Sequence, residues 1–313
     1  MRRLTKKFTT FAVCAITACT GGFGEKQTTP GGTEVGTHVR GLSTMINDDH
    51  PSIIYSAKCC SAANPWNHVQ IDGDYAGDET NSNQARTPDP QVTGASAVVN
   101  FYGTDIVWIG RTGRHFGMAR YSVDGGPARF VDLFYDGEDQ FQVPVVPIPG
   151  LNPGSHALEI DVTPNTSGDD YLVSIDAFSI NGSPLTLDQA SLITWQTAST
   201  APDMAWVCGA QPGNVGGGFC WTFAPGATWS GSFSGSLFEL FGHPDAEDGS
   251  FEVILDGNHY AYVNGQFGTI DDDLLASTPF LIGRVDPGDH NIQIVSMSDG
   301  TQATQIDSVV AFP

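Results

Sequence analysis

The sequence predicts an all-β protein made of two tandem antiparallel jelly-roll β-sandwich domains. Short runs of β-branched and aromatic residues recur between turn residues, and helical periodicity is hard to find. From Gly94 onward the sequence also contains a repeat, with the second copy about 132 residues downstream of the first. For example, the Phe-x-Gly of 101–103 returns at 233–235. Such a repeat is longer than the roughly 20–50 residues of a solenoid unit. It therefore indicates two copies of a complete small domain.

Strands are expected where apolar and polar residues alternate. In the run 156–162, Leu158, Ile160 and Val162 would face one side and the residues between them the other, which is typical of a strand with one buried face. The other strands expected in the first copy are 97–102, 105–109, 119–123, 130–135, 142–146 and 171–178.

Two kinds of turn recur at matching places in the copies. The Asp-Gly pairs at 124–125 and 256–257 each lie between strands, and Asp-Gly is a strong hairpin signal because glycine tolerates positive φ. The Pro-Gly-x-His turns at 153–156 and 287–290 form the second pair. For the histidine of each turn we favour a hydrogen bond to loop carbonyls over catalysis, since no nucleophile in an elbow setting accompanies it.

The repeat also indicates the domain boundaries. We expect a first β-sandwich over 46–183 and a second over 186–313, joined by so short a seam that the two should touch. Tyr55 and Trp66 stand eleven positions apart, as do Trp195 and Trp206, which extends the repeat backward.

Residues 1–18 predict an export signal, because basic residues precede an apolar run far shorter than the roughly 20 residues of a membrane span. Ile-Thr-Ala before Cys19 resembles a bacterial lipobox, so we favour lipidation of Cys19, with ordinary cleavage near Ala18 as the alternative. Thr20 implies, by resemblance to Gram-negative sorting, the outer membrane and the cell surface. Residues 19–45 are rich in Gly and Thr and should form a flexible tether.

The composition is strongly acidic. The formal net charge is −22, and loss of the signal with its four basic residues makes it −26. Nucleic acid and anionic lipid are therefore excluded as partners, because phosphate binding needs clusters of Lys and Arg. Contact with a membrane is expected through the lipid anchor alone.

Four cysteines remain once the signal is removed and Cys19 carries lipid. We favour a disulfide between Cys208 and Cys220, which enclose a Gly-rich loop in an exported chain. For Cys59 and Cys60 a vicinal disulfide, cross-pairing and free thiols all stay open.

The runs 101–110 and 121–125, the turn 150–156 and the closing segment 175–178 resemble the galactose-binding-like superfamily of jelly-roll domains. This superfamily includes many carbohydrate-binding modules. The resemblance covers nearly all of the first domain and the second domain from Gly226 onward. It implies the fold, and by analogy it implies carbohydrate as the partner.

The resemblance also implies a candidate metal site. In relatives, calcium often ties the first segment to the last strand, which makes Asp48, Asp49 and Asp176 a candidate cluster. Oxygen ligands suit calcium, and a buried aspartate must be paired or bind metal. The alternative is that backbone hydrogen bonds satisfy these carboxylates. No other cofactor is expected.

Sugar recognition needs an exposed aromatic face and polar groups for the hydroxyls. Trp66 with His68, and Trp206 in the second domain, are candidates for the face, with core packing as the alternative for each Trp. The loop 111–116 carries Arg and His, whereas its counterpart 243–248 is acidic, so the two copies should differ in ligand preference. The polar candidates in these loops are Arg111, Arg114, His115, His243 and Asp245.

The sequence thus favours a non-catalytic surface lipoprotein that binds polysaccharide through loops of two β-sandwiches. Hydrolysis would need two carboxylates across a scissile bond, and no P-loop or GxGxxG follows a strand. The first alternative is a structural or adhesive protein whose partners are cell-surface proteins. The second is a polysaccharide hydrolase or esterase accessory.

Overall fold

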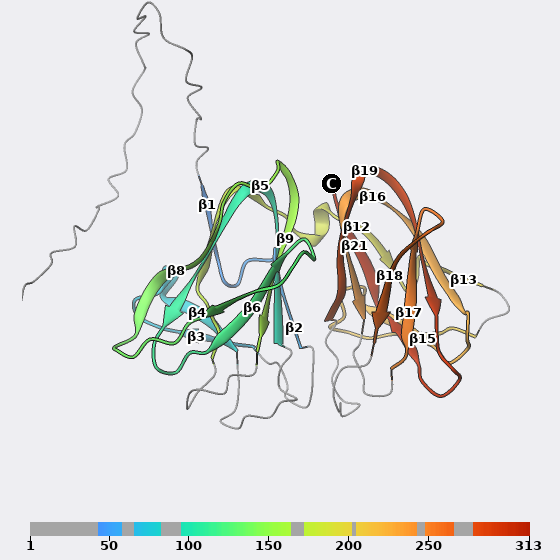
Figure 1. Ribbon diagram of the computed structural model, residues 1–313, viewed down its shortest axis with the longest axis horizontal. Helices are drawn as coiled ribbons and strands as arrows, with labels where there is room; N and C mark the ends of the chain where they lie inside the picture. Colours follow the sequence, from blue (N-terminus) through green and yellow to red (C-terminus); the bar gives the residue numbers. More distant parts are fainter. Residues whose placement is uncertain are drawn as a thin grey trace, which may run out of the picture. The chain divides into compact units, whose positions relative to one another are not determined.

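Figure 1 shows the computed structural model of the chain. It describes residues 43–57, 66–82, 95–163, 172–201, 205–242, 248–265 and 278–313. The predicted export signal, nearly all of the tether, Cys19, Cys59, Cys60, His243 and Asp245 lie outside the described residues.

The described residues confirm the predicted all-β class and form two sandwich-like bodies. Every ladder between named strands is antiparallel, and the helical content of these residues is two short 3-10 turns. Within the same residues, no helix has the length and apolar character needed to cross a membrane.

The first body is organised around one long strand, β5. Its first half pairs with β2 and β9 and its second half with β8 and β11, so that β5 contributes to both layers of the sandwich. Phe101, Trp108 and Phe178 are fully buried between the layers. A small sheet of order β10-β4-β3 completes the body. The strands are β1 (Thr44–Asn47), β2 (Ile53–Ala57), β3 (Trp66–Gln70), β4 (Asp78–Ser82), β5 (Ala95–Thr112), β6 (Met118–Val123), β7 (Arg129–Asp132), β8 (Gln140–Ile148), β9 (Gly154–Val162), β10 (Ser174–Ile175) and β11 (Ala177–Pro184).

The second body repeats this plan around β16. Its large sheet has the order β12-β21-β16-β19-β17-β18, with β13 also on β16, and its small sheet has the order β14-β15-β20. Trp229, Phe238 and Phe251 fill its core. The strands are β12 (Ser191–Thr194), β13 (Ser199–Thr200), β14 (Val207–Ala210), β15 (Gly218–Thr222), β16 (Thr228–Gly242), β17 (Ser250–Leu255), β18 (Asn258–Asn264), β19 (Thr278–Ser296), β20 (Thr304–Ile306) and β21 (Ser308–Phe312).

The repeated turns of each body are tied together by one Asp–His pair. Asp124 Oδ2 lies 2.8 Å from His156 Nδ1, and Asp256 Oδ2 lies 2.7 Å from His290 Nδ1. The other ring nitrogen of each histidine lies 2.7 or 2.8 Å from a loop carbonyl oxygen. Both aspartates have positive φ, as an Asp-Gly hairpin requires. These contacts confirm the structural role predicted for the two histidines.

Residues 40–313 form one compact unit, and a mixed apolar cluster joins the two bodies within it. Glu239 on β16 is fully buried near this cluster, where Asn100 Nδ2 of β5 lies 3.5 Å from its carboxyl oxygen. Burial raises the pKa of Glu239 to about 8, so this carboxyl group is protonated at neutral pH. The cluster consists of Val98, Ala157, Leu185, Leu237, Phe241, Ile282, Val310 and Phe312.

The predicted disulfide between Cys208 and Cys220 is confirmed. The two residues lie opposite each other on β14 and β15, with their Cα atoms 4.1 Å apart. The bond therefore staples the small sheet of the second body. Its presence indicates an oxidising compartment, extracellular or periplasmic.

Replacing Cys208 and Cys220 together with serine should lower the free energy of unfolding by about 3 kcal/mol, because the bond closes a short loop in the unfolded chain. Denaturant titration followed by intrinsic fluorescence measures this change. A reductant should destabilise the wild-type protein more than the double variant. Equal responses of the two proteins would contradict the prediction.

Candidate functional site

Five carboxylates from separate elements meet in the first body, and we name them the carboxylate cluster. One follows β1, one precedes the 3-10 turn Tyr75–Gly77, two open β4 and one lies between β10 and β11. Because β1 pairs with β11, the backbone N–H of Asp48 donates to the carbonyl oxygen of Asp176 at 3.1 Å. The cluster consists of Asp48, Asp74, Asp78, Glu79 and Asp176.

Several oxygens of this cluster are buried and have no hydrogen-bond partner among the described residues. They are Asp48 Oδ1, both carboxylate oxygens of Asp74, and Asp176 Oδ2. The other oxygen of Asp176 accepts the backbone N–H of Tyr75 at 2.8 Å. Burial, reinforced by neighbouring carboxylates, raises the pKa of Asp74 and that of Asp176 to about 7. Carboxylates that are buried without hydrogen-bond partners are stable only when they bind a proton or a cation.

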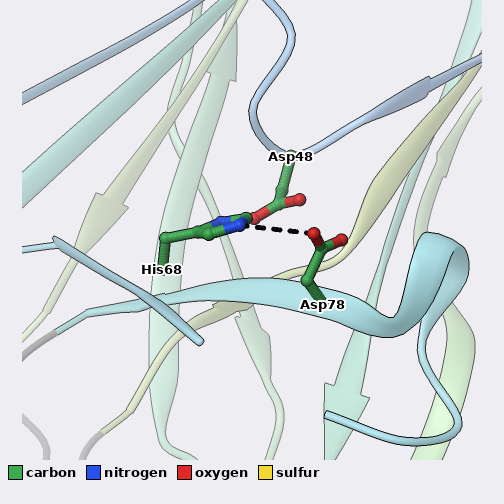
Figure 2. A group of neighbouring side chains, drawn as sticks. All are labelled: Asp48, His68 and Asp78. Carbon is green, nitrogen blue, oxygen red and sulfur yellow. Dashed lines mark hydrogen bonds and ion pairs between the residues drawn. The ribbon is translucent and has the colours of Figure 1, made fainter. Parts of the chain in front are cut away.

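His68 on β3 lies between two of the carboxylates (Figure 2). Its Nδ1 is 2.7 Å from Asp48 Oδ2, and its Nε2 is 3.3 Å from Asp78 Oδ2. Burial opposes protonation of the ring, but the facing carboxylates outweigh it and raise the pKa of His68. The ligand atoms of the three residues all lie within 4.8 Å of one another. His68 thus lies in an acidic site, and we do not find it beside an exposed Trp.

Arg111 supplies the main permanent positive charge at the cluster. Its guanidinium lies 2.5 Å from Glu79 Oε1 and 4.9 Å from the centre of the Phe116 ring. The loop 111–116 therefore turns its first arginine inward. Arg114 is exposed and pairs with Asp136 at 2.8 Å, and His115 is exposed as well.

The carboxylate oxygens of the cluster are donors of the type that calcium takes, and the ligand atoms that lie within 4.8 Å of one another are those of Asp48, His68 and Asp78. Calcium takes six to eight oxygen ligands, largely from carboxylates, and Asp48, Asp74 and Asp176 offer unpartnered buried oxygens. Of the aspartates expected from the sequence, Asp49 does not join them, because it is exposed and its carboxylate accepts the side-chain amide of Asn47. Three members of the cluster that were not expected from the sequence, Asp74, Asp78 and Glu79, lie in its acidic run 72–79. Its approach to the closing strand is a long-range contact, which local pattern does not reveal.

The second body has a different chemistry at the same place. His68 faces Thr80 across β3 and β4, and the matching register across β14 and β15 places Cys208 opposite Cys220. Both pairs are followed by the same turn hydrogen bonds, from Ile71 N to Gly77 O and from Gln211 N to Gly217 O. The disulfide therefore occupies the position of the His–Thr pair.

Most carboxylates of the cluster are also lost in the second copy. Trp195 takes the place of Asp48, because each directly follows the first strand of its body in matching register. Tyr55 corresponds to Thr200 rather than to Trp195, which corrects the backward extension drawn from spacing. By the same registers, Asp74, Asp78, Glu79 and Asp176 are replaced by Asn214, Gly218, Phe219 and Asp307.

The one carboxylate that is retained, Asp307, accepts hydrogen bonds from the backbone. Its two oxygens accept the backbone N–H groups of Val215 and Gly216, each at 3.1 Å. Burial still raises the pKa of Asp307 to about 7. Backbone hydrogen bonds, one of the two alternatives weighed for such aspartates, are therefore observed in the second body, whereas the first body has oxygens without a partner among the described residues.

The small sheet of the second body carries aromatic residues on its outer face, and we name Phe219, Trp221 and Phe223 the aromatic stripe. The alternate residues, Cys220 and Thr222, are buried. The rings of Phe219 and Trp221 stack with centroids 5.1 Å apart and planes inclined by 28°. Phe223 is 50% exposed. The stripe thus consists of two partly exposed rings on β15 and an exposed ring directly after this strand.

Neighbouring strands widen this surface. Val207 on β14 lies opposite Trp221 and is 47% exposed. On the other side, Gln305 of β20 lies opposite the same Trp221, and its amide donates to Asp248 at 2.9 Å. An apolar strip thus borders a polar edge across three strands.

Of the two tryptophans expected to present an exposed face, Trp66 is buried and Trp206 is half-buried. Trp66 is 3% exposed, its ring packs 5.1 Å from that of Tyr55, and its Nε1 donates to Ser96 O at 3.2 Å. Trp206 is half-buried against the second core, with its Nε1 buried. Core packing, the alternative weighed for both, is therefore what Trp66 shows, and Trp206 combines contact with the core and partial exposure. The signal that would have found the stripe is the alternation of aromatic residues around Cys220.

Comparison with known proteins yields distant structural likenesses. No protein-family model matches the chain, and no curated protein matches it in sequence. A xanthan lyase from Paenibacillus is 14% identical over 81% of this chain, with a TM-score of 0.28, and this chain spans a quarter (25%) of it. The CBM36-1 domain of a multidomain xylanase from the hindgut metagenome of Trinervitermes trinervoides is 14% identical, with a TM-score of 0.29 over 39% of this chain and 94% of that domain.

A GH26-CBM35 β-(1,4)-mannanase from Podospora anserina is 21% identical over 37% of this chain and 27% of its own, with a TM-score of 0.26. These are carbohydrate-active enzymes and carbohydrate-binding modules. At TM-scores near 0.3 such likenesses carry no argument about function, which must come from this chain's own residues.

Calcium should stabilise the first body, and the effect should grow with pH. In the metal-free protein the raised pKa values of Asp74 and Asp176 contribute stability at acidic pH that is lost as pH rises through about 7. Calcium at about 100 times its Kd should raise Tm by roughly 5 °C at pH 8 and by less at pH 5. Calorimetry with calcium or with a chelator measures both values.

Asp176→Asn should weaken the calcium response, whereas the matched change Asp49→Asn on an exposed side chain should leave it intact. A calcium response that is equal in both variants would contradict the site.

Proposed function

We propose that this protein is a non-catalytic carbohydrate-binding protein and that the aromatic stripe of the second body is its glycan-binding surface. The stacked, partly exposed pair of Phe219 and Trp221, continued by the exposed Phe223, is the observation that carries this proposal. Sugar rings present flat C–H faces that pack on aromatic rings, and their edges need polar groups. The stripe offers the aromatic rings, and its border at Gln305 offers the polar groups.

The shape of the surface favours an extended polymer over a small molecule. Residues that alternate along a strand are about 6.6 Å apart, from the rise of roughly 3.3 Å per residue, so the stripe can contact successive sugar units. An apolar strip on an otherwise acidic surface also marks an interaction site. A protein partner, as for an adhesive protein, is the competing occupant.

The proposal of a non-catalytic role is supported by the positions of the histidines. His156 and His290, the repeated candidates for acid–base chemistry, use both ring nitrogens to hold turns. In the first body, the carboxylate cluster would bind calcium as a structural tie between Asp48 after β1 and Asp176 before β11. We therefore assign the two bodies different roles. Calcium would stabilise the fold of the first body, and the second body carries the glycan-binding surface.

Trp221→Ala should weaken retention on insoluble polysaccharides by at least about tenfold, because a central aromatic anchor supplies much of the binding energy at such a surface. Tyr262→Ala is the matched control, since Tyr262 lies in the same body and is 67% exposed but is outside the stripe. Depletion from solution over a panel of neutral and acidic polysaccharides measures the affinity.

Retention that is equal in the two variants would refute the assignment of the stripe. Absence of retention on every polysaccharide would favour the adhesive alternative. Release of reducing sugar from any of them would refute the non-catalytic role.

We also propose that the protein is exported and held at the outer membrane by lipid on Cys19. The Cys208–Cys220 bond supports an oxidising compartment, and the lipobox-like residues before Cys19 support the anchor. Cys19→Ala should abolish incorporation of labelled palmitate and release the protein from the membrane fraction. Label that persists in this variant would show that the anchor is elsewhere.

A further inference from the structure

A cleft of about 240 Å³ opens at the edge of the first body, between the β6–β7 hairpin and the end of β8. It lies outside both the carboxylate cluster and the aromatic stripe. One aromatic ring, one guanidinium and several prolines line it, which combines a rigid apolar wall with a single cation. Its principal lining residues are Tyr121, Val123, Pro127, Arg129, Pro147 and Pro149.

Arg129 is the exceptional arginine of the described residues. Four of the five arginines there are held by a carboxylate: Arg111 by Glu79, Arg114 by Asp136, Arg120 by Asp161 and Arg284 by Asp124. Arg129 is exposed and makes no ion pair or side-chain hydrogen bond within this part of the chain. In a protein of net charge −22, a guanidinium without a carboxylate partner beside a cleft is a local attraction for an anion.

Tyr121 is placed to act together with this guanidinium. Tyr121 and Arg129 are direct partners across the β6–β7 ladder, so their side chains leave the sheet on the same face. A ring-shaped ligand against Tyr121 would therefore bring a carboxylate substituent within reach of Arg129. A planar guanidinium suits a carboxylate because it can donate two parallel hydrogen bonds.

The second body has neither of these side chains at the same register. Val253 and Ala261 are partners across β17 and β18 where the first body has Tyr121 and Arg129. Tyr260, displaced by a bulge in β18, packs its ring 5.3 Å from that of Phe238 and places its hydroxyl 3.4 Å from Arg284 O. One copy thus fills this edge with a tyrosine ring, and the other keeps it open beside a cation.

We infer that the cleft of the first body binds one anionic sugar unit of the uronate class, with its carboxylate on Arg129 and its ring against Tyr121. The prolines supply a wall that needs no ordering on binding, which lowers the entropic cost of binding. The choice of a sugar over another ring-bearing carboxylate rests on the proposed function. The site itself does not depend on the aromatic stripe.

Titration of the full chain with D-galacturonate, D-galactose and acetate tests the ligand class. Galacturonate should bind at least about tenfold more tightly than either of the others, because galactose lacks the carboxylate and acetate lacks the ring. Calorimetry or ligand-observed NMR measures the three affinities. Galactose that binds as tightly as galacturonate would overturn the role of the charge, and acetate that does so would overturn the role of the ring.

Two variants take the residue of the other copy, which this fold already accommodates at that register. Arg129→Ala and Tyr121→Val should each reduce galacturonate binding by at least about tenfold with Tm little changed. Phe130→Ala removes an exposed neighbouring side chain that does not line the cleft and should leave the affinity unchanged. Undiminished binding by Arg129→Ala would overturn the site.

Trp221→Ala keeps failure of this inference distinct from failure of the proposed function. It should lose retention on polysaccharide and keep galacturonate binding at the cleft. Loss of both properties in Trp221→Ala would place galacturonate on the stripe and overturn the cleft. Benzoate that binds as tightly as galacturonate would overturn the assignment to a sugar.

Discussion

The cost of burying carboxylates without a counterion is the constraint that sets the two bodies apart. In the first body, Asp48, Asp74 and Asp176 converge where the opening strand, the acidic turn and the closing strand meet, and part of their hydrogen-bonding capacity is unused. Such an arrangement is stable only with a proton or a cation in place. The second body avoids the cost of buried carboxylates without partners. Asp307 accepts hydrogen bonds from backbone N–H groups, and a disulfide joins the neighbouring strands.

The replacement of buried carboxylates by a disulfide and backbone hydrogen bonds also changes the surface of the second body. Where the first body has Glu79 on β4, buried under Arg111, the second has Phe219 on β15 at the start of the aromatic stripe. A covalent staple needs no neighbouring charges, so the outward positions of the same strand are available for apolar residues. At another edge of the sandwich it is the first body that is open. Its cleft lies beside Arg129, whereas Tyr260 fills the matching edge of the second body. The duplication therefore preserved a frame, and the two copies carry different side chains at matching positions of that frame.

Local chemistry explains which features could be anticipated from the chain. The Asp-Gly hairpins, the histidine of each Pro-Gly-x-His turn and the Cys208–Cys220 bond depend on residues close in sequence or repeated at a constant offset, and all three are observed. Side-chain exposure was harder to anticipate, since a Trp at the start of a strand suits a core and a binding face equally. Trp66 proved to be core, and the partly exposed ring is Trp221, whose neighbours on both sides point inward.

By itself the sequence determined the all-β class, the duplication and the strand-and-turn frame, because these follow from periodicity of two and from turn residues that act over a few positions. Tertiary structure alone decided that Asp74 rather than Asp49 joins Asp48 and Asp176, and that Arg129 has no carboxylate partner among the described residues. Those outcomes depend on the pairing of strands as much as a hundred residues apart. Such pairing decides which side chains share a dry environment, and it is burial that turns an ordinary aspartate or tyrosine into a site.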